Sequence, residues 1–392
     1  MGRPKKESNI FYELKNNKYY FKIKWFNNHC KDLKKLSDAY ANVGYSIANQ
    51  LICKYKKNCM DYTLKEDIIY YTFSGIYSFQ LSIELLLKAI IAKFKGKNSL
   101  FQNIQKNRHN IYNLFLYVKS NLNILDDKCI YLEKYLENMC SIDSQCTLFR
   151  YPDIYKYSKL NKNIDVYKTF KNLLKCYNVL EKIFNKEDFN DMDEDNFLYF
   201  NKKNCINGIY LDFYGIEYRI MEFSYGYYQT AKMLFSNIDN TFDNFDFTKS
   251  FPIIFFMRNA IELIHKNIIL QHNQRVNNKK ELKNHNNKDL LKTIQKFLKE
   301  YFNYADFNNP DTKLKTYLKE INALEKFDKN SYTFRYPFSK NLDYKLNNIN
   351  LDLKNIFDIL EEIFEFLVGI NEGMANLISQ EKEANMMENT IY

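Results

Sequence analysis

The sequence predicts a mainly α-helical protein built as two helical bundles in tandem, each preceded by a short β-hairpin. Three observations support this fold class. The 392 residues include only nine Gly and five Pro, which disfavours a turn-rich β-sandwich or propeller. Apolar residues recur every three or four positions through most of the chain, as in amphipathic helices. Three short motifs also occur twice in the same order.

The repeated motifs define the predicted organisation. Residues 79–88 match residues 257–266, the His-Asn pair at 109–110 matches the pair at 285–286, and Phe-Arg-Tyr-Pro occurs at 149–152 and 334–337. The offsets of 178, 176 and 185 residues are nearly constant, so we interpret the chain as a tandem duplication. The expected parts are repeat 1 at 1–186, an acidic linker at 187–196 and repeat 2 at 197–392.

Repeat 1 opens with a strand-like segment. Tyr19, Phe21, Ile23 and Trp25 alternate with other residues, and residues 15–18 have turn composition, so a hairpin is expected. Helical spacing then predicts helices at about 31–57, 66–95, 109–120, 127–140 and 164–185.

Repeat 2 follows the same order. Residues 197–200 and 209–213 are strand-like and flank a turn, which predicts a second hairpin. Helices are expected at about 216–237, 249–272, 287–303, 312–327 and 349–380. In both repeats a basic, Asn-rich loop is expected after the second helix.

Charge separates the two repeats. The net charge is +10, and residues 1–186 hold 32 basic and 16 acidic residues, whereas residues 197–392 hold 25 of each. A basic repeat attracts polyanions, so RNA is the expected partner and DNA the alternative. The candidate nucleic-acid-binding residues lie in and beside the two basic loops: Lys93, Lys95, Lys97, Lys106, Arg108 and His109, and Arg275, Lys279, Lys280, Lys283 and His285. The structural alternative is that the lysines are simply solvated and that both histidines cap the following helices.

Other classes of protein are disfavoured. The basic N-terminus is followed by no long apolar run, and segments 81–92 and 251–257 are too short to span a bilayer, so a soluble, cytoplasmic protein without a membrane partner is expected. The eight Cys contain no C-x-x-C pair, which favours reduced structural thiols over zinc. Without a Walker loop or H-E-x-x-H motif, we expect no cofactor and no metal.

Two segments of repeat 1 resemble a known superfamily. Residues 82–89 (S-I-E-L-L-L-K-A) followed by His109-Asn110 and Leu114 are similar to the HEPN superfamily, and residues 260–266 with 285–290 carry a weaker match. The resemblance implies a four- or five-helix bundle that pairs with a second copy. Members occur in prokaryotic anti-phage defence and toxin–antitoxin systems. Many are metal-independent endoribonucleases, and others are non-catalytic binding or scaffold domains.

Active members of this superfamily use an R-x(4–6)-H motif, which the resemblance places here at Arg258 and His265. The two side chains are two helical turns apart on one face. Arginine would bind the phosphate, and histidine would exchange a proton with the 2′-hydroxyl or the leaving oxygen, so the implied substrate is RNA. Repeat 1 has Gln80 and Leu87 at these positions, and a homodimer would bring two intact pairs together.

Two functions therefore follow from the sequence. The first is a HEPN-type endoribonuclease of a bacterial anti-phage defence or toxin system. The second is a non-catalytic module that binds nucleic acid and assembles with a partner defence protein. Glu84 and Glu262, each four residues before a lysine, are expected to form ordinary surface ion pairs.

Overall fold

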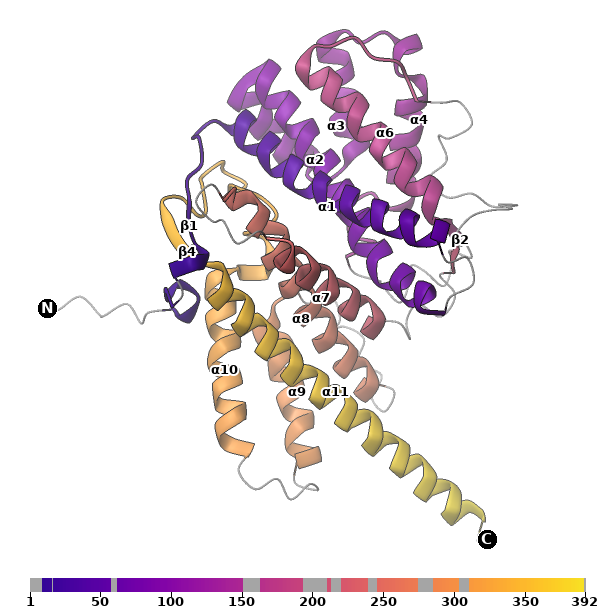
Figure 1. Ribbon diagram of the computed structural model, residues 1–392, viewed down its shortest axis with the longest axis vertical. Helices are drawn as coiled ribbons and strands as arrows, with labels where there is room; N and C mark the ends of the chain where they lie inside the picture. The colour runs from indigo at the N-terminus through magenta and orange to yellow at the C-terminus, as the bar shows by residue number, and fades with distance from the viewer. Residues whose placement is uncertain are drawn as a thin grey trace, which may run out of the picture.

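The protein is mainly helical, with two small antiparallel sheets (Figure 1). The computed structural model describes residues 9–15, 17–57, 62–150, 163–192, 210–212, 220–238, 245–273, 285–302 and 310–390. The helices, strands and contacts given below belong to these residues.

The first half of the chain contains five long helices and two strands: β1 (Tyr20–Ile23), α1 (His29–Lys57), α2 (Tyr62–Asn107), α3 (Ile111–Leu122), α4 (Ile130–Ile142), β2 (Asn163–Asp165) and α6 (Val166–Asn185). The predicted helices are confirmed to within a few residues, with one exception. The segment expected to form a basic loop after residue 95 is helical, because α2 changes direction at Gly96 (φ 77°) and continues to Asn107. Only glycine adopts such a φ readily.

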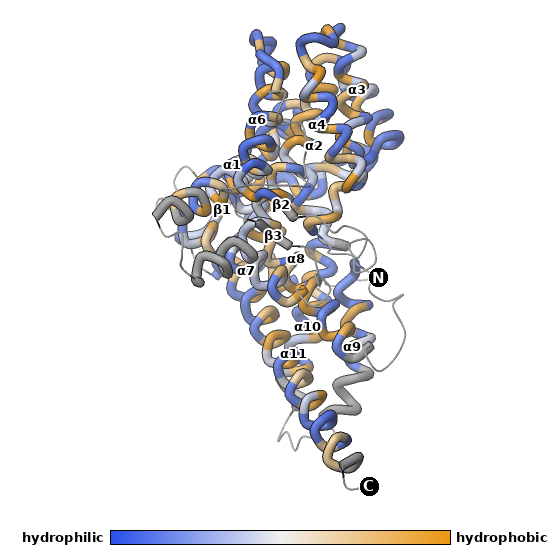
Figure 2. The backbone as a smooth tube through the Cα atoms, turned by 90° about the vertical axis from the view of Figure 1, so that its right-hand side faces the viewer, coloured by the Kyte–Doolittle hydropathy of each residue, from blue (hydrophilic) through white to orange (hydrophobic). Residues whose placement is uncertain are grey.

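The second half repeats this order: β3 (Tyr210–Asp212), α7 (Ile220–Ser236), α8 (Ser250–Asn273), α9 (Asn287–Phe302), α10 (Pro310–Phe327), β4 (Ile349–Asp352) and α11 (Leu353–Thr390). Short 3-10 turns complete the described part of the chain: η1 (Ile10–Tyr12), η2 (Asn17–Tyr19), η3 (Asp126–Lys128), η7 (Phe247–Lys249) and η9 (Lys329–Ser331). Helix α11 is longer than expected, and Figures 1 and 2 show its last turns extending away from the other helices. Met386 and Met387 on these turns are 68% and 67% exposed.

The two halves pack in the same way. In the first, α2 contacts α1, α3 and α6; in the second, α8 contacts α7, α9 and α11. Equivalent hydrogen bonds accompany this packing. The Ser37 hydroxyl donates to the carbonyl of Ser82 (2.7 Å), and the Ser224 hydroxyl donates to the carbonyl of Ala260 (2.8 Å). Helices α2 and α8 are therefore the central helices of their respective halves.

The strands pair between the halves, so the first predicted hairpin is wrong. Strand β1 pairs antiparallel with β4, and β2 pairs antiparallel with β3. Phe21, Ile23 and Trp25 are buried, as the alternation predicts, but the partner strand lies more than 300 residues away. Of the expected second hairpin, only residues 210–212 are described.

The segment of α2 from Tyr70 to Asn107 is long and apolar enough to cross a membrane by length and composition. In the structure, 94% of its most apolar window is buried inside the protein. Packing in the core accounts for the apolar character of this helix.

Helices α2 and α7 pack tightly against each other at Gly226. A Cβ atom at this position would lie 2.2 Å from the carbonyl oxygen of Tyr70, well inside van der Waals contact. Because that oxygen belongs to the backbone, the two helices would have to separate.

We therefore expect Gly226→Ala to lower the free energy of unfolding by about 2 kcal/mol or more. Gly369→Ala and Gly373→Ala on α11 are matched controls, since a Cβ atom there meets nothing within 4 Å. These two changes should stabilise the helix by roughly 0.5 to 1 kcal/mol. Urea denaturation followed by circular dichroism measures all three, and an unchanged Gly226→Ala variant would contradict the packing.

Candidate functional site: two carboxylate–histidine clusters

The first cluster surrounds the carboxylate of Glu84, which is buried in α2. Lys88, one turn later, places Nζ 2.5 Å from Oε1, and His109 places Nδ1 3.0 Å from the same oxygen. The Tyr336 hydroxyl, from the second half, donates to this carboxylate at 3.1 Å. Burial alone would raise the pKa of Glu84, but Lys88 and His109 hold it well below its usual range.

The second cluster has the same plan around Glu262 in α8. Lys266 Nζ lies 3.0 Å and His285 Nδ1 lies 2.9 Å from Oε1 of this buried carboxylate. Arg150, from the first half, approaches Oε2 at 3.7 Å. Burial opposes ionisation, yet the surrounding cations hold the pKa of Glu262 well below its usual range.

The predicted i,i+4 ion pairs thus form, but the expectation that they lie on the surface is wrong. Lys88 and Lys266 are 3% and 6% exposed. A buried carboxylate that lost its cations would carry a large desolvation penalty, so removing a cation from either cluster would destabilise the folded protein.

The histidines do not cap the helices that follow them. The cap of α3 is Asn110, whose Oδ1 accepts from the amide of Asn113 at 2.8 Å. Before α9, Oδ1 of Asn286 accepts from the amide of Asp289 at 3.2 Å. Each His-Asn pair therefore divides two tasks, because asparagine caps the helix while histidine binds the carboxylate.

Each repeated Phe-Arg segment contacts the opposite half of the chain. The hydroxyl of Tyr227, on α7, donates to the carbonyl of Phe149 at 2.5 Å, and the hydroxyl of Tyr40, on α1, donates to the carbonyl of Phe334 at 2.9 Å. Each segment thus lies against the other half, where Arg150 also donates from Nε to Oδ1 of Asn259 (3.1 Å). Tyr151 and Pro152 of the first motif lie outside the described residues.

A turn that precedes each Phe-Arg segment was missed by sequence reasoning. The carboxylate of Asp143 accepts from the amides of Thr147 and Leu148, and that of Asp328 accepts from the amide of Thr333. Three residues after each aspartate, Cys146 and Ser331 have positive φ values of 51° and 54°. The signal was available, because both aspartates lie six residues before the phenylalanine of the motif.

Arg258 and His265, the candidate catalytic pair, are both fully buried in α8. Arg258 Nη2 lies 2.6 Å from Oε1 of Glu325. His265 donates from Nδ1 to the carbonyl of Ile261 (2.8 Å) and accepts at Nε2 from the hydroxyl of Tyr317 (2.5 Å). Burial lowers the pKa of His265 to about 3, so its imidazole is neutral and both ring nitrogens are occupied.

The candidate basic residues of the first half are exposed. Lys93, Lys95, Lys97, Lys106 and Arg108 all lie on α2 or immediately after it. Arg275, Lys279, Lys280 and Lys283 lie outside the described residues, so the second half of the predicted surface is not described. His109 and His285 are 26% and 46% exposed at their side chains.

After Gly96, one face of α2 carries Lys97, Phe101 and Gln105, which recur every four residues. Arg108 follows directly after the last helical residue, Asn107, and has a positive φ of 49°. These four residues form a stripe at the end of α2. All four are exposed, and Phe101 is 39% exposed despite its size. We refer to these four residues as the α2 stripe.

Lys93 has a different role from the α2 stripe. Its Nζ donates to the carbonyl of Phe184 (2.6 Å) and lies 4.1 Å from the centre of the Phe184 ring. This lysine packs the end of α6 against α2.

Within the described part of the chain, no group of three or more His, Cys, Asp or Glu side chains could hold a metal ion. Comparison with protein families, with curated proteins and with solved structures gives no match to the chain.

The environment of His265 predicts a pH dependence of stability. Its pKa is about 3 in the folded protein, against about 6.5 in an unfolded chain. As the pH falls below about 6.5, the unfolded chain binds a proton that the folded protein does not, so stability is lost.

The stability of the protein should thus fall by up to about 1.4 kcal/mol per pH unit from this group alone. In His265→Gln, the slope of unfolding free energy between pH 6 and pH 5 should be smaller by about that amount. His29→Gln is the control, since His29 lies half-buried on α1, where its ring contacts the Leu342 carbonyl and the rings of Phe338 and Tyr344. Equal slopes in the parent and in His265→Gln would contradict the buried, neutral imidazole.

Proposed function

We propose that the chain is a tandem HEPN-like module that binds RNA on the α2 stripe, and that Arg258 and His265 have structural roles. The observation that carries this proposal is the group of exposed basic residues at the end of α2. Residues 85–125 contain no Asp or Glu, and Lys95, Lys97, Lys106 and Arg108 in this stretch are exposed.

The α2 stripe has the composition that single-stranded nucleic acid requires. Lys97 and Arg108, at the two ends of the stripe, would each bind a phosphate. Phe101, between them, offers an exposed ring on which a base can stack. Gln105, between Phe101 and Arg108, is neutral and adds no charge. Its side-chain amide donates to the carbonyl of Lys340.

Burial supports the structural role of the proposed catalytic pair. Arg258 binds Glu325, and Glu325 also accepts from the amide of Asn287 at the start of α9 (2.9 Å). This chain of contacts joins α8, α9 and α10. Removing Arg258 would leave a buried carboxylate without its cation, which typically costs about 3 to 5 kcal/mol.

RNA binding should depend on salt and on the α2 stripe. For the double variant Lys97→Ala/Arg108→Ala, we expect weaker binding and a salt slope smaller by about 1.4, since each lost phosphate contact to a single strand removes about 0.7. Phe101→Ala should cost about 1 to 3 kcal/mol with little change in slope. Fluorescence anisotropy with a labelled single-stranded RNA at several salt concentrations measures both quantities.

The matched control is Lys292→Ala, because Lys292 is an exposed lysine on α9 that pairs with Asp289. It should bind RNA as the parent does. Unchanged affinity and slope in the double variant would exclude the α2 stripe as the binding surface.

A second candidate function, RNA cleavage, is favoured by the geometry of His109. Glu84 contacts Nδ1 at 3.0 Å, so Nε2 is the ring nitrogen left for a substrate, and no hydrogen-bond partner of Nε2 is found among the described residues. A carboxylate that orients histidine in this way makes the other nitrogen an effective base. Arg108 lies directly beside it. The role in anti-phage defence rests on the superfamily resemblance.

Cleavage would be tested by incubating the protein with end-labelled RNA in the presence of EDTA. If His109 is the base, products with cyclic-phosphate ends should form, and His109→Ala should reduce their rate by about 10²- to 10⁴-fold while RNA binding persists. Intact RNA with the parent protein would leave the non-catalytic module as the function.

A further inference from the structure

A closed loop of the second half lies beside the α2 stripe. It comprises residues 338–345, directly after the second Phe-Arg-Tyr-Pro motif, and is named the 338–345 loop. The Ser339 amide donates to the carbonyl of Asp343 at 2.8 Å, and the Ser339 hydroxyl oxygen accepts from the amides of Asn341 (3.1 Å) and Asp343 (3.3 Å). These bonds close the loop, and Lys340 and Asn341 form its exposed tip.

Side chains of α1, in the first half, hold the 338–345 loop in place. His29 contacts the carbonyl of Leu342 through Nε2 (3.1 Å), and its ring centre lies 4.9 Å from that of Phe338. The Tyr344 hydroxyl donates to the carboxylate of Asp32 at 2.5 Å. Leu342 and Phe338 are each 3% exposed. The loop is therefore a packed part of the junction between the halves, and its tip has a defined position.

The tip of the loop touches the α2 stripe. The side-chain amide of Gln105 donates to the main-chain carbonyl of Lys340 at 3.2 Å. The Lys340 side chain is exposed, and its ammonium forms no ion pair with any described residue. Asp343 is the one carboxylate of the loop, against the two lysines Lys340 and Lys345, so the loop does not cancel the positive charge of the stripe.

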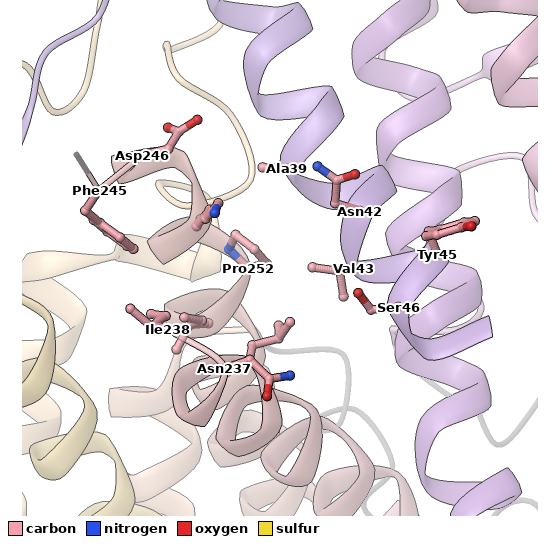
Figure 3. A pocket seen from close by; sticks show the side chains of 13 residues that line it. Ala39, Asn42, Val43, Tyr45, Ser46, Asn237, Ile238, Phe245, Asp246 and Pro252 are labelled. Atoms are coloured by element: carbon pink, nitrogen blue, oxygen red, sulfur yellow. The ribbon is translucent and has the colours of Figure 1, made fainter. Parts of the chain in front are cut away.

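The two halves do not meet this closely along their whole junction. A hollow lies between α1 and the α7–α8 segment, where the polar side chains of Asn42 and Asn237 are exposed (Figure 3). At the 338–345 loop, by contrast, a residue of the second half contacts a residue of the stripe directly. A ligand that binds the stripe there can contact both halves at once.

We propose that the tip of the 338–345 loop is part of the RNA-binding surface, so that one strand contacts both halves of the chain. The inference rests on the proposed binding of RNA to the α2 stripe. Phe101 lies one helical turn before Gln105 on the same face, and Gln105 contacts Lys340. Lys340 therefore binds a phosphate of the nucleotide whose base stacks on Phe101, and the basic residues of the stripe bind phosphates further along the strand.

The test measures binding of a labelled single-stranded RNA to the full chain by fluorescence anisotropy at several salt concentrations. Lys340→Ala should weaken binding and reduce the salt slope by about 0.7, because one phosphate contact is lost. Combined with Lys97→Ala/Arg108→Ala, it should bring the total reduction to about 2.1.

Lys382→Ala is the matched control. Lys382 is an exposed lysine of the same half, on the last turns of α11 that extend away from the other helices (Figure 1). Its removal changes the net charge equally, yet RNA should bind as it does to the parent. Lys340→Ala keeps the main-chain carbonyl that Gln105 contacts, so the loop should stay in place, and an unchanged Tm verifies this.

Two results would overturn the inference. One is binding by Lys340→Ala with the affinity and salt slope of the parent; if Lys97→Ala/Arg108→Ala still weakens binding, the α2 stripe remains the RNA surface. The other is an equal loss in Lys340→Ala and Lys382→Ala, since the effect would then follow net charge alone. If Lys97→Ala/Arg108→Ala binds as the parent does, the proposed function itself fails, whatever Lys340→Ala does.

Discussion

The reciprocal docking of the two Phe-Arg segments is the contact on which the rest of the structure depends. A tyrosine hydroxyl in each half binds the main-chain carbonyl of the phenylalanine from the other half, at Phe149 and Phe334. This contact places Arg150 beside Glu262 and Tyr336 beside Glu84. Buried carboxylates are tolerated only with suitable partners. Each half therefore supplies part of the environment that lets the other half keep a charge in its core.

Helix α2 serves two purposes because of Gly96. Before this residue, α2 is the central helix of the first half and carries Glu84 and Lys88. After it, the helix turns and exposes the α2 stripe. The buried cluster and the exposed basic surface meet at His109, which binds Glu84 on one side and faces solvent on the other. A structural ion-pair network and a proposed RNA surface thus share one histidine.

Much of the helical architecture was predictable because amphipathic spacing is local. The helix after Gly96 was missed because its lysines and asparagines suggested a loop, although Leu100 and Ile104 are buried at helical spacing. The first hairpin was wrong because alternation identifies a strand but not its partner. In the candidate site, the shared face of Arg258 and His265 followed from their spacing, but α8 is buried on all sides, which no local pattern reveals. The Glu84–His109 contact could not be predicted from local spacing, because the turn between α2 and α3 brings His109 back beside α2.

The exchange of strands between the halves has a consequence for how such a chain can arise. Two identical copies of a single half could pair their first and last strands with each other and close as a twofold homodimer. In that dimer, every substitution would appear on both sides of the axis. Fusion into one polypeptide removes this constraint, so a position can change on one side alone. Gln80 and Arg258 occupy equivalent places in α2 and α8 and differ in charge, which a symmetric ancestor could not have allowed.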